Sequence, residues 1–209
     1  RLVLIEDASE LNPVHPHVVS LEARHGNLEG GGVVDLGELV RQSLRMRPDR
    51  LVVGECRGAE VRELLAAMNT GHSGGGGTIH ANTAADVPAR LAALGALAGM
   101  GQDTVRLQAA SALDAVVHVE RLDNARSVVG IGVLEDGPAG LIVGSALDIG
   151  GGAVRAGPAW PLLAVRLRLD PDGLAHDGPD PDGRGTPGSA GSARPQGEPA
   201  WSDPGGGTA

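Results

Sequence analysis

The chain has 209 residues and a formal net charge of −9, and its apolar residues are almost all aliphatic, with no Phe, no Tyr and only two Trp. Base stacking needs aromatic faces and nucleic-acid binding usually needs a basic surface, so this composition argues against a nucleic-acid partner. The single cysteine, Cys56, cannot form a disulfide within the chain and indicates a reducing compartment. No apolar run is long enough to cross a bilayer.

Strand and helix patterns alternate along the first two thirds of the chain. In chain order, the patterns predict a strand over 1–7, an extended loop or short strands over 8–32, a helix over 35–46, a strand over 50–55, a helix over 58–71, a glycine loop and short strand over 74–82, a helix over 83–99, a helix and then a strand over 103–122, and a strand over 127–136. Asp35 and Thr83 are expected to cap the helices that they precede. This order predicts an α/β fold whose mainly parallel sheet is flanked by helices.

The composition changes toward the end of the chain. Residues 1–136 form the expected domain, and residues 137–169 contain the stretches GLIVGSALDI and PAWPLLAVRLRL, which are expected to add edge strands. Residues 170–209 are mostly Gly, Pro, Asp and Ser, with little that could be buried, and this composition predicts a disordered tail.

Carboxylates follow two of the predicted strands directly. Glu6 and Asp7 end the first strand, Glu10 lies just beyond, and Glu55 ends the strand over 50–55. In nucleotide-hydrolysing α/β domains, a buried strand delivers such an acid to the carboxyl edge of the sheet. There a carboxylate can hold Mg²⁺, usually through water, or orient an attacking water.

A structural interpretation of the same charged residues is open. Glu55 can cap the following helix, whose amino-terminal dipole favours an anion. The acids of the first strand can form ion pairs with Arg45, Arg47 or Arg57. Alternatively, Arg47, Arg50 and Arg57 can clamp phosphate, because a guanidinium group makes bidentate contacts.

Two histidines, His72 and His80, stand on either side of the glycine run Gly74–Gly77. Glycines allow a ligand to approach the backbone closely, and an imidazole N–H can donate to a phosphoryl oxygen. No cysteine or acid stands at metal-ligand spacing around the histidines, which favours a phosphate contact over zinc. The alternative is a flexible loop with one packed histidine. Cys56 is interpreted as a small buried residue rather than a nucleophile.

Four ordered motifs carry a family resemblance: LIEDASEL, LRMRPDRLVVGECRGAE, AAMNTGHSGGGGTIHAN and DVPARL. Together they closely resemble the type II/type IV secretion-system ATPases, and most of all the motors of tight-adherence (Flp) pili, over about residues 1–135. The resemblance implies a RecA-like ATPase core that uses ATP and Mg²⁺. It also implies a homo-hexamer at the cytoplasmic face of the inner membrane, working with an inner-membrane platform protein in pilus assembly or protein export.

The resemblance also implies a role for each candidate residue. Glu6 would polarise the attacking water, with Asp7 and Glu10 as supporting acids. Glu55 would be the Walker B acid, acting on Mg²⁺ through water. The implied nucleotide-binding residues are His80 as the sensor of the γ-phosphate, His72 as its support, and Arg24, Arg47 and Arg57 as arginines that reach phosphates within one subunit or across a subunit boundary.

One motif of the family does not occur in this sequence. The Walker A stretch G-x-x-x-x-G-K-[ST], which precedes the first acidic motif in the family, is absent, and the chain contains no lysine at all. We therefore expect the carboxyl-terminal part of such an ATPase, inactive alone, with the edge of its first strand exposed. The alternative is a non-catalytic remnant or assembly partner. A helicase-like enzyme fits less well, because it would not be expected to carry the histidine motif.

Overall fold

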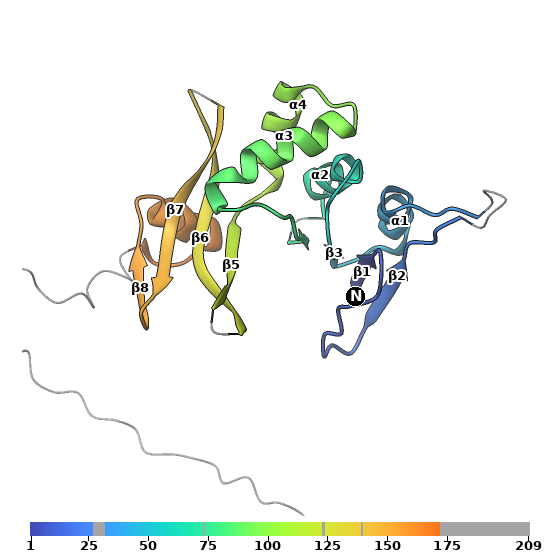
Figure 1. Cartoon of the computed structure of the whole chain (residues 1–209), viewed down its shortest axis with the longest axis horizontal. Coiled ribbons are helices and arrows are strands. Elements are labelled where there is room, and N and C mark those ends of the chain that lie inside the picture. The colour runs from blue at the N-terminus through green and yellow to red at the C-terminus, as the bar shows by residue number, and fades with distance from the viewer. Residues whose placement is uncertain (27–31, 73, 123, 139, 172–209) are drawn as a thin grey trace, which may run out of the picture. The chain divides into compact units, whose positions relative to one another are not determined.

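The computed structural model describes residues 1–26, 32–72, 74–122, 124–138 and 140–171. These residues all fall within one compact unit, Arg1–Ala175. The predicted disorder of residues 170–209 lies almost entirely outside the described residues. Within the described part, two four-stranded sheets are each accompanied by helices (Figure 1). None of the described helices is long and apolar enough to span a membrane.

The first sheet is parallel, as predicted. Its strands are β1 (Leu2–Glu6), β2 (Val18–Glu22), β3 (Arg50–Val53) and β4 (Gly76–Gly77), in the order β2-β1-β3-β4. The run of β1 is apolar at consecutive positions because both faces of a parallel strand are covered. The expectation that β1 lies at an exposed edge is wrong. β2 pairs with one side of β1 and β3 with the other, so the edge strands of this sheet are β2 and β4.

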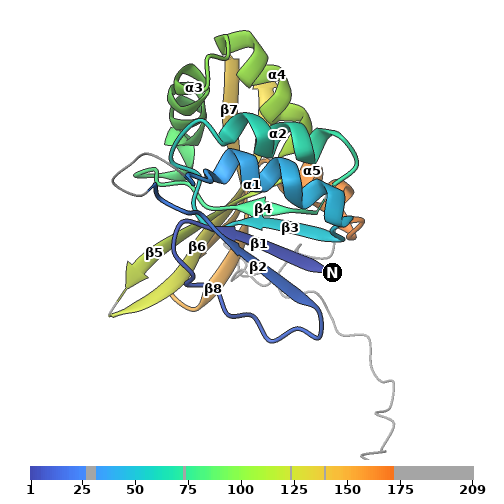
Figure 2. The ribbon, with the colours of Figure 1, turned by 90° about the vertical axis from the view of Figure 1, so that its right-hand side faces the viewer.

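Helices α1 (Leu36–Ser43) and α2 (Val61–Asn69) cover one face of the parallel sheet (Figure 2). The predicted cap of α1 is confirmed, because the Asp35 carboxylate accepts the Glu38 N–H at 2.7 Å. A 3-10 turn (Leu44–Met46) continues α1 to the predicted end. The strand expected after the glycines is instead the two-residue β4, formed by the glycines themselves.

Helices α3 (Val87–Leu97) and α4 (Gln102–Ala112) pack against each other beside α2. A 3-10 turn (Ala84–Asp86) leads into α3. Thr83 is the N-cap residue of this turn and forms a capping box with Asp86, whose carboxylate accepts the backbone N–H and the hydroxyl of Thr83 at 3.1 and 2.8 Å.

The second sheet is an antiparallel meander. Its strands β5 (Val116–Leu122), β6 (Ala125–Gly137), β7 (Gly140–Gly150) and β8 (Ala153–Ala156) pair in chain order. The GLIVGSALDI stretch is therefore an interior strand, β7, rather than an edge. β8 was not predicted; Gly151 and Gly152, with φ angles of 60° and 76°, provide the left-handed turn that folds it back onto β7.

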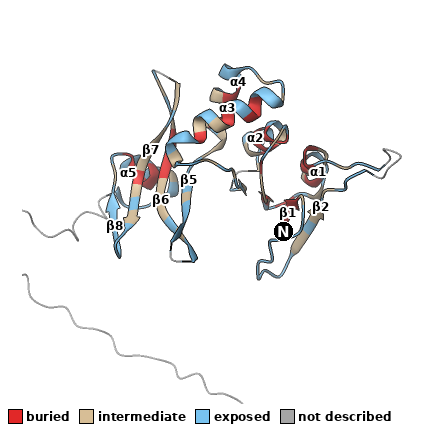
Figure 3. Cartoon of the chain, in the orientation of Figure 1, coloured by how far each residue is buried: buried red, intermediate tan, exposed pale blue. Residues whose placement is uncertain are grey.

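The PAWPLLAVRLRL stretch forms the helix α5 (Trp160–Leu167) rather than a strand. Its buried residues Trp160, Leu163 and Ala164 recur at helical spacing and pack with Val133 and Ala146 on one face of the antiparallel sheet. On β6, Leu134 points away from this cluster and belongs to the main core with α1 to α4 and the parallel sheet. The buried positions of both cores are coloured in Figure 3.

Candidate functional site

The carboxyl edge of the parallel sheet brings most of the candidate residues together. Ile5 of β1 is opposite Val53 of β3, so the residues that follow the two strands emerge side by side. The same register places the segment after β2, and the segment after β4, at this edge. The candidate residues that end these four strands or follow them are Glu6, Asp7, Glu10, Arg24, Glu55, Arg57 and His80.

Glu55 and His80 lie close together beyond β3 and β4. His80 Nε2 is 3.3 Å from Glu55 Oε1, and the two side chains are 85% and 39% exposed. Two hydrogen bonds tie the segments that carry them: the Cys56 N–H donates to the Thr78 carbonyl at 2.8 Å, and the Thr78 hydroxyl donates to the Gly54 carbonyl. This exposed carboxylate–imidazole pair is therefore held by the backbone of the two strand ends.

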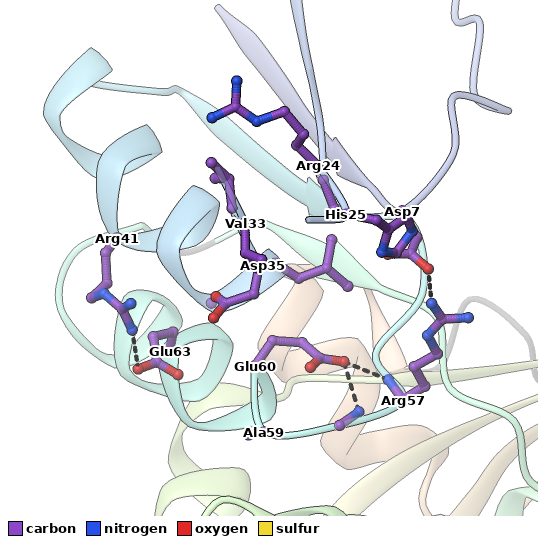
Figure 4. A pocket seen from close by; sticks show the side chains of 15 residues that line it. Asp7, Arg24, His25, Val33, Asp35, Arg41, Arg57, Ala59, Glu60 and Glu63 are labelled. Atoms are coloured by element: carbon purple, nitrogen blue, oxygen red, sulfur yellow. Dashed lines mark hydrogen bonds and ion pairs between the residues drawn. The ribbon is translucent and has the colours of Figure 1, made fainter. Parts of the chain in front are cut away.

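Asp7 and Arg57 form an ion pair across the ends of β1 and β3. Both residues line a cleft of about 380 Å³, together with Arg24 from the end of β2 (Figure 4). Asp7 therefore forms the ion pair with Arg57 that the structural interpretation of the sequence allowed. Arg24 uses its Nε to donate to the Gly32 carbonyl at 2.5 Å.

Glu6 differs from the other candidate acids because it is only 4% exposed. Its Oε1 accepts the backbone N–H groups of Glu10 and Leu11, at 3.0 and 2.9 Å, and so folds the loop that follows β1. The side chain lies over Gly54, where an added Cβ would come within 2.8 Å of Glu6 Cγ. Gly54, the glycine of LVVGE, is thus required because the Glu6 side chain from the adjacent strand β1 occupies the space that a Cβ would need. The role of Glu6 in polarising water, and of Glu10 as its support, stays a prediction.

Glu60 was missed in the sequence analysis. Its Oε1 accepts the N–H groups of Arg57 and Gly58, at 2.6 and 2.7 Å, and the residue is only 9% exposed. Glu60 also directly precedes α2, so the alternative that Glu55 caps this helix is wrong. The available signal was an acid next to a predicted helix start, but that signal also describes many exposed residues.

Cys56 is the small buried residue that the sequence predicted, with 4% of its surface exposed. Burial, followed by the negative charge of Glu60, raises the pKa of the Cys56 thiol to about 12. A thiol with such a pKa is protonated at neutral pH and is a poor nucleophile.

Two candidate residues lie away from this cluster. Arg47 precedes β3 and lies at the amino edge of the sheet, next to Met46, whose carbonyl accepts from Arg1. His72 follows α2 and precedes β4, whereas His80 follows β4, so the two histidines are at opposite ends of this short strand. The Nδ1 atom of His72 is buried without a hydrogen-bond partner among the described residues. The roles of Arg47 and His72 stay predictions.

The residues at this edge are only a partial fit to a magnesium nucleotide. Glu55 offers an accessible carboxylate, and His80 and Arg57 offer N–H donors. In the part of the chain that the structure describes, no three His, Cys, Asp or Glu side chains are grouped so that they could hold a metal ion by themselves. Mg²⁺ would therefore take most of its ligands from water and phosphate, as it commonly does in nucleotide sites.

Comparison with known proteins identifies the family. The sequence pattern of the family "Type II/IV secretion system protein" matches residues 1–130, and the chain belongs to this family. The resemblance of the four motifs to the type II/type IV secretion-system family is thereby confirmed.

The chain is similar to two curated proteins that are named for conjugal transfer. It is 59% identical over 121 residues to a putative conjugal transfer protein of Mycobacterium tuberculosis, a match that covers 58% of this chain and 34% of the relative. It is 38% identical over 128 residues to the conjugal transfer protein TrbB of Rhizobium radiobacter, covering 61% of this chain and 37% of the relative. The chain thus spans about a third of the length of these relatives.

One solved structure supports the fold. The VirB11 ATPase from the Brucella suis type IV secretion system, solved in complex with sulphate, matches with a TM-score of 0.54 and 27% identity. The match covers 64% of this chain and 41% of the VirB11 chain. The α/β fold with a parallel sheet and flanking helices is therefore that of a secretion ATPase, as predicted.

Proposed function

We propose that this chain supplies the nucleotide-facing carboxyl edge of a motor ATPase, in which ATP hydrolysis drives type II or type IV secretion, conjugal transfer or Flp pilus assembly. The observation that carries the proposal is the 3.3 Å approach of Glu55 and His80, at the same sheet edge as the Asp7–Arg57 pair that joins the loops after β1 and β3. Acid and base converge where a parallel α/β sheet binds its ligands.

Each residue has a chemical task in this proposal. Glu55 orients the water around the nucleotide phosphates, and Mg²⁺, when bound, neutralises the charge of those phosphates. His80 donates an N–H to the terminal phosphate, for which its exposure and its place beside Glu55 are suitable. Arg57 and Arg24 contact phosphate oxygens from the cleft in Figure 4. Arg57 is paired with Asp7, so it can contact phosphate only if a phosphate oxygen replaces the Asp7 carboxylate or binds the guanidinium group beside it.

The partners follow from the family. We infer a homo-hexamer at the cytoplasmic face of the inner membrane, bound to an inner-membrane platform protein, with Arg24, Arg47 or Arg57 reaching phosphate across a subunit boundary. The similarity to conjugal transfer proteins and to the VirB11 ATPase supports this assignment. The alternative of a non-catalytic assembly partner makes the opposite prediction for nucleotide binding.

Nucleotide binding distinguishes the two candidates. A fluorescent ATP analogue is titrated with Mg²⁺ into the wild-type chain, Glu55→Gln, His80→Ala and the control Glu120→Gln, which changes an exposed residue of β5. We expect saturable binding by the wild type and the control, weakened by about tenfold in Glu55→Gln and His80→Ala, because each substitution changes a group that would contact the phosphates or the water around them. Equal affinity in all four proteins, or no saturation at millimolar nucleotide, would contradict the ATPase proposal, and the second outcome would favour the assembly partner.

A further inference from the structure

The turn between β3 and α2, residues 55–60, carries both Glu55 and Arg57. We propose that Glu60 is the positioning residue of this turn: its buried carboxylate sets the backbone of Arg57 and thereby presents Arg57, and Glu55 before it, at the carboxyl edge of the sheet. What Glu55 and Arg57 do there rests on the proposed function. That Glu60 positions them rests on the contacts alone.

The contacts of Glu60 are directed at two consecutive backbone donors. Glu60 Oε1 accepts from the Arg57 N–H at 2.6 Å and from the Gly58 N–H at 2.7 Å. Hydrogen bonds to an ionised carboxylate are about twice as strong as neutral ones, and this carboxylate is shielded from water. A side chain at position 58 would be crowded, because an added Cβ would lie 3.0 Å from Glu60 Oε2. The sequence RGAE thus forms one unit in which the glycine admits the glutamate.

The neighbouring strand uses the same arrangement. Glu6 at the end of β1 is also buried, and it also accepts two consecutive backbone N–H groups, those of Glu10 and Leu11. The Asp7–Arg57 ion pair then joins two loops that are each held by a glutamate. Because Glu60 Oε1 is engaged with two backbone N–H groups, this oxygen acts on a ligand only through the groups that it places. This geometry makes Glu60 a positioning residue.

Cys56 reports directly on this turn, because it is the only cysteine of the chain and stands between Glu55 and Arg57. We expect its buried thiol to react slowly with an aromatic disulfide reagent as long as Glu60 holds the backbone N–H groups of the turn. Two substitutions separate hydrogen bonding from charge. Glu60→Asp keeps the charge but is one methylene too short to reach both N–H groups, whereas Glu60→Gln keeps the length and removes the charge.

The matched control is Glu63→Gln, which changes the same residue type one turn further along α2. Glu63 pairs with Arg41 at 2.8 Å. We expect thiol reaction rates about tenfold higher in Glu60→Asp and Glu60→Gln, and within about twofold of wild type in Glu63→Gln. A wild-type reaction rate in Glu60→Asp would overturn the proposal. This holds even if Glu60→Gln reacts faster, because loss of the Glu60 charge alone lowers the pKa of the Cys56 thiol and speeds its reaction.

A second measurement follows Arg57 itself and excludes a merely structural role. In protein labelled with ¹⁵N-arginine, the side-chain Nε–H signal of Arg57 is assigned by its loss in Arg57→Lys. We expect this signal to move in Glu60→Asp toward its position in Asp7→Asn, with thermal unfolding close to wild type, and to stay in place in Glu63→Gln. An unmoved Arg57 signal in a folded Glu60→Asp variant would overturn the proposal. If Glu60→Asp does not fold, the same criterion applies to Glu60→Gln.

Nucleotide affinity then separates this inference from the proposed function. If the wild-type chain binds the fluorescent ATP analogue, Glu60→Asp should weaken binding as much as Arg57→Ala does, and the double variant should be no weaker than either. Additive losses would overturn the positioning role. If the wild type does not bind, the proposed function fails, whereas the thiol and arginine measurements still decide the role of Glu60.

Discussion

The two sheets of this protein differ in where they place chemically active side chains. In the parallel sheet, every strand ends at the same edge, so the acids after β1 and β3 meet the arginine after β2 and the histidine after β4. In the antiparallel sheet, successive strands end at opposite edges, and none of the candidate residues lies on it. Strand direction alone therefore concentrates the candidate site in one half of the described chain.

The sheets also differ in how they are covered. β1 is apolar and buried on both faces, whereas β5 and β8 expose valines such as Val117 and Val154. One face of the antiparallel sheet contributes Leu134 to the main core, and the other builds a smaller core with α5. The antiparallel sheet therefore packs against the site region through one face only.

The largest expected effect comes from the smaller core. Leu163→Ala removes a buried side chain from α5 and should lower the free energy of unfolding by about 2–5 kcal/mol. Hydrogen exchange should rise in β6 and β7 while the protection of β1 and β3 is largely kept. The control, Leu162→Ala, changes the adjacent and partly exposed residue and should have a small effect. An equal rise of exchange in both sheets would show that they unfold as one unit.

The second effect is specific to the parallel sheet and to high pH. The chain has neither Tyr nor Lys, α-amino groups titrate near pH 8 and arginine above pH 12, so Cys56 is the one side chain that titrates between pH 9 and 12. Its pKa rises from 9.0 to about 12 on folding, so the unfolded state loses its proton first. The contribution of the protonated thiol to the free energy of unfolding is therefore fully present below pH 9. Above pH 9 the free energy of unfolding falls, by up to about 1.4 kcal/mol per pH unit.

Denaturant unfolding at pH 8 to 11 measures this slope. Cys56→Ala should be less stable than wild type at pH 8 but nearly independent of pH across the range, because the titrating group is gone. The same slope in wild type and Cys56→Ala would contradict the burial of the thiol beside Glu60.

The smallest expected effect concerns an ion pair between the two regions. Arg106 of α4 contacts both carboxylate oxygens of Asp136 on β6, at 2.6 and 2.7 Å, and the two residues hold the end of the antiparallel sheet against the helices. Arg106→Gln should lower the urea midpoint slightly, and the difference from wild type should shrink at high salt, because the pair is partly exposed. Arg121→Gln, at the tip of β5, is the control. A large salt-independent loss would show that the pair is essential to the junction.

Local patterns in the sequence determined much of this protein. The continuous apolar runs before Glu6 and Glu55 predicted parallel strands and the edge at which their acids meet, and Asp35 and Thr83 predicted the helix starts. These features depend on neighbours in the chain, so they can be read from short stretches. The four motifs, in their order, were specific enough to indicate the family.

Only the tertiary structure decided which charged groups are accessible. Glu6, Glu55 and Glu60 all stand near strand or helix ends, yet Glu55 is open to solvent, whereas the other two are buried and bound to backbone N–H groups. The direction of the last strands and the helix α5 also depended on packing, because an apolar stretch fits a strand or a helix equally well until its partner surface is known. Burial and pairing are properties of the whole fold, and they separate the residues that can touch a ligand from those that hold them in place.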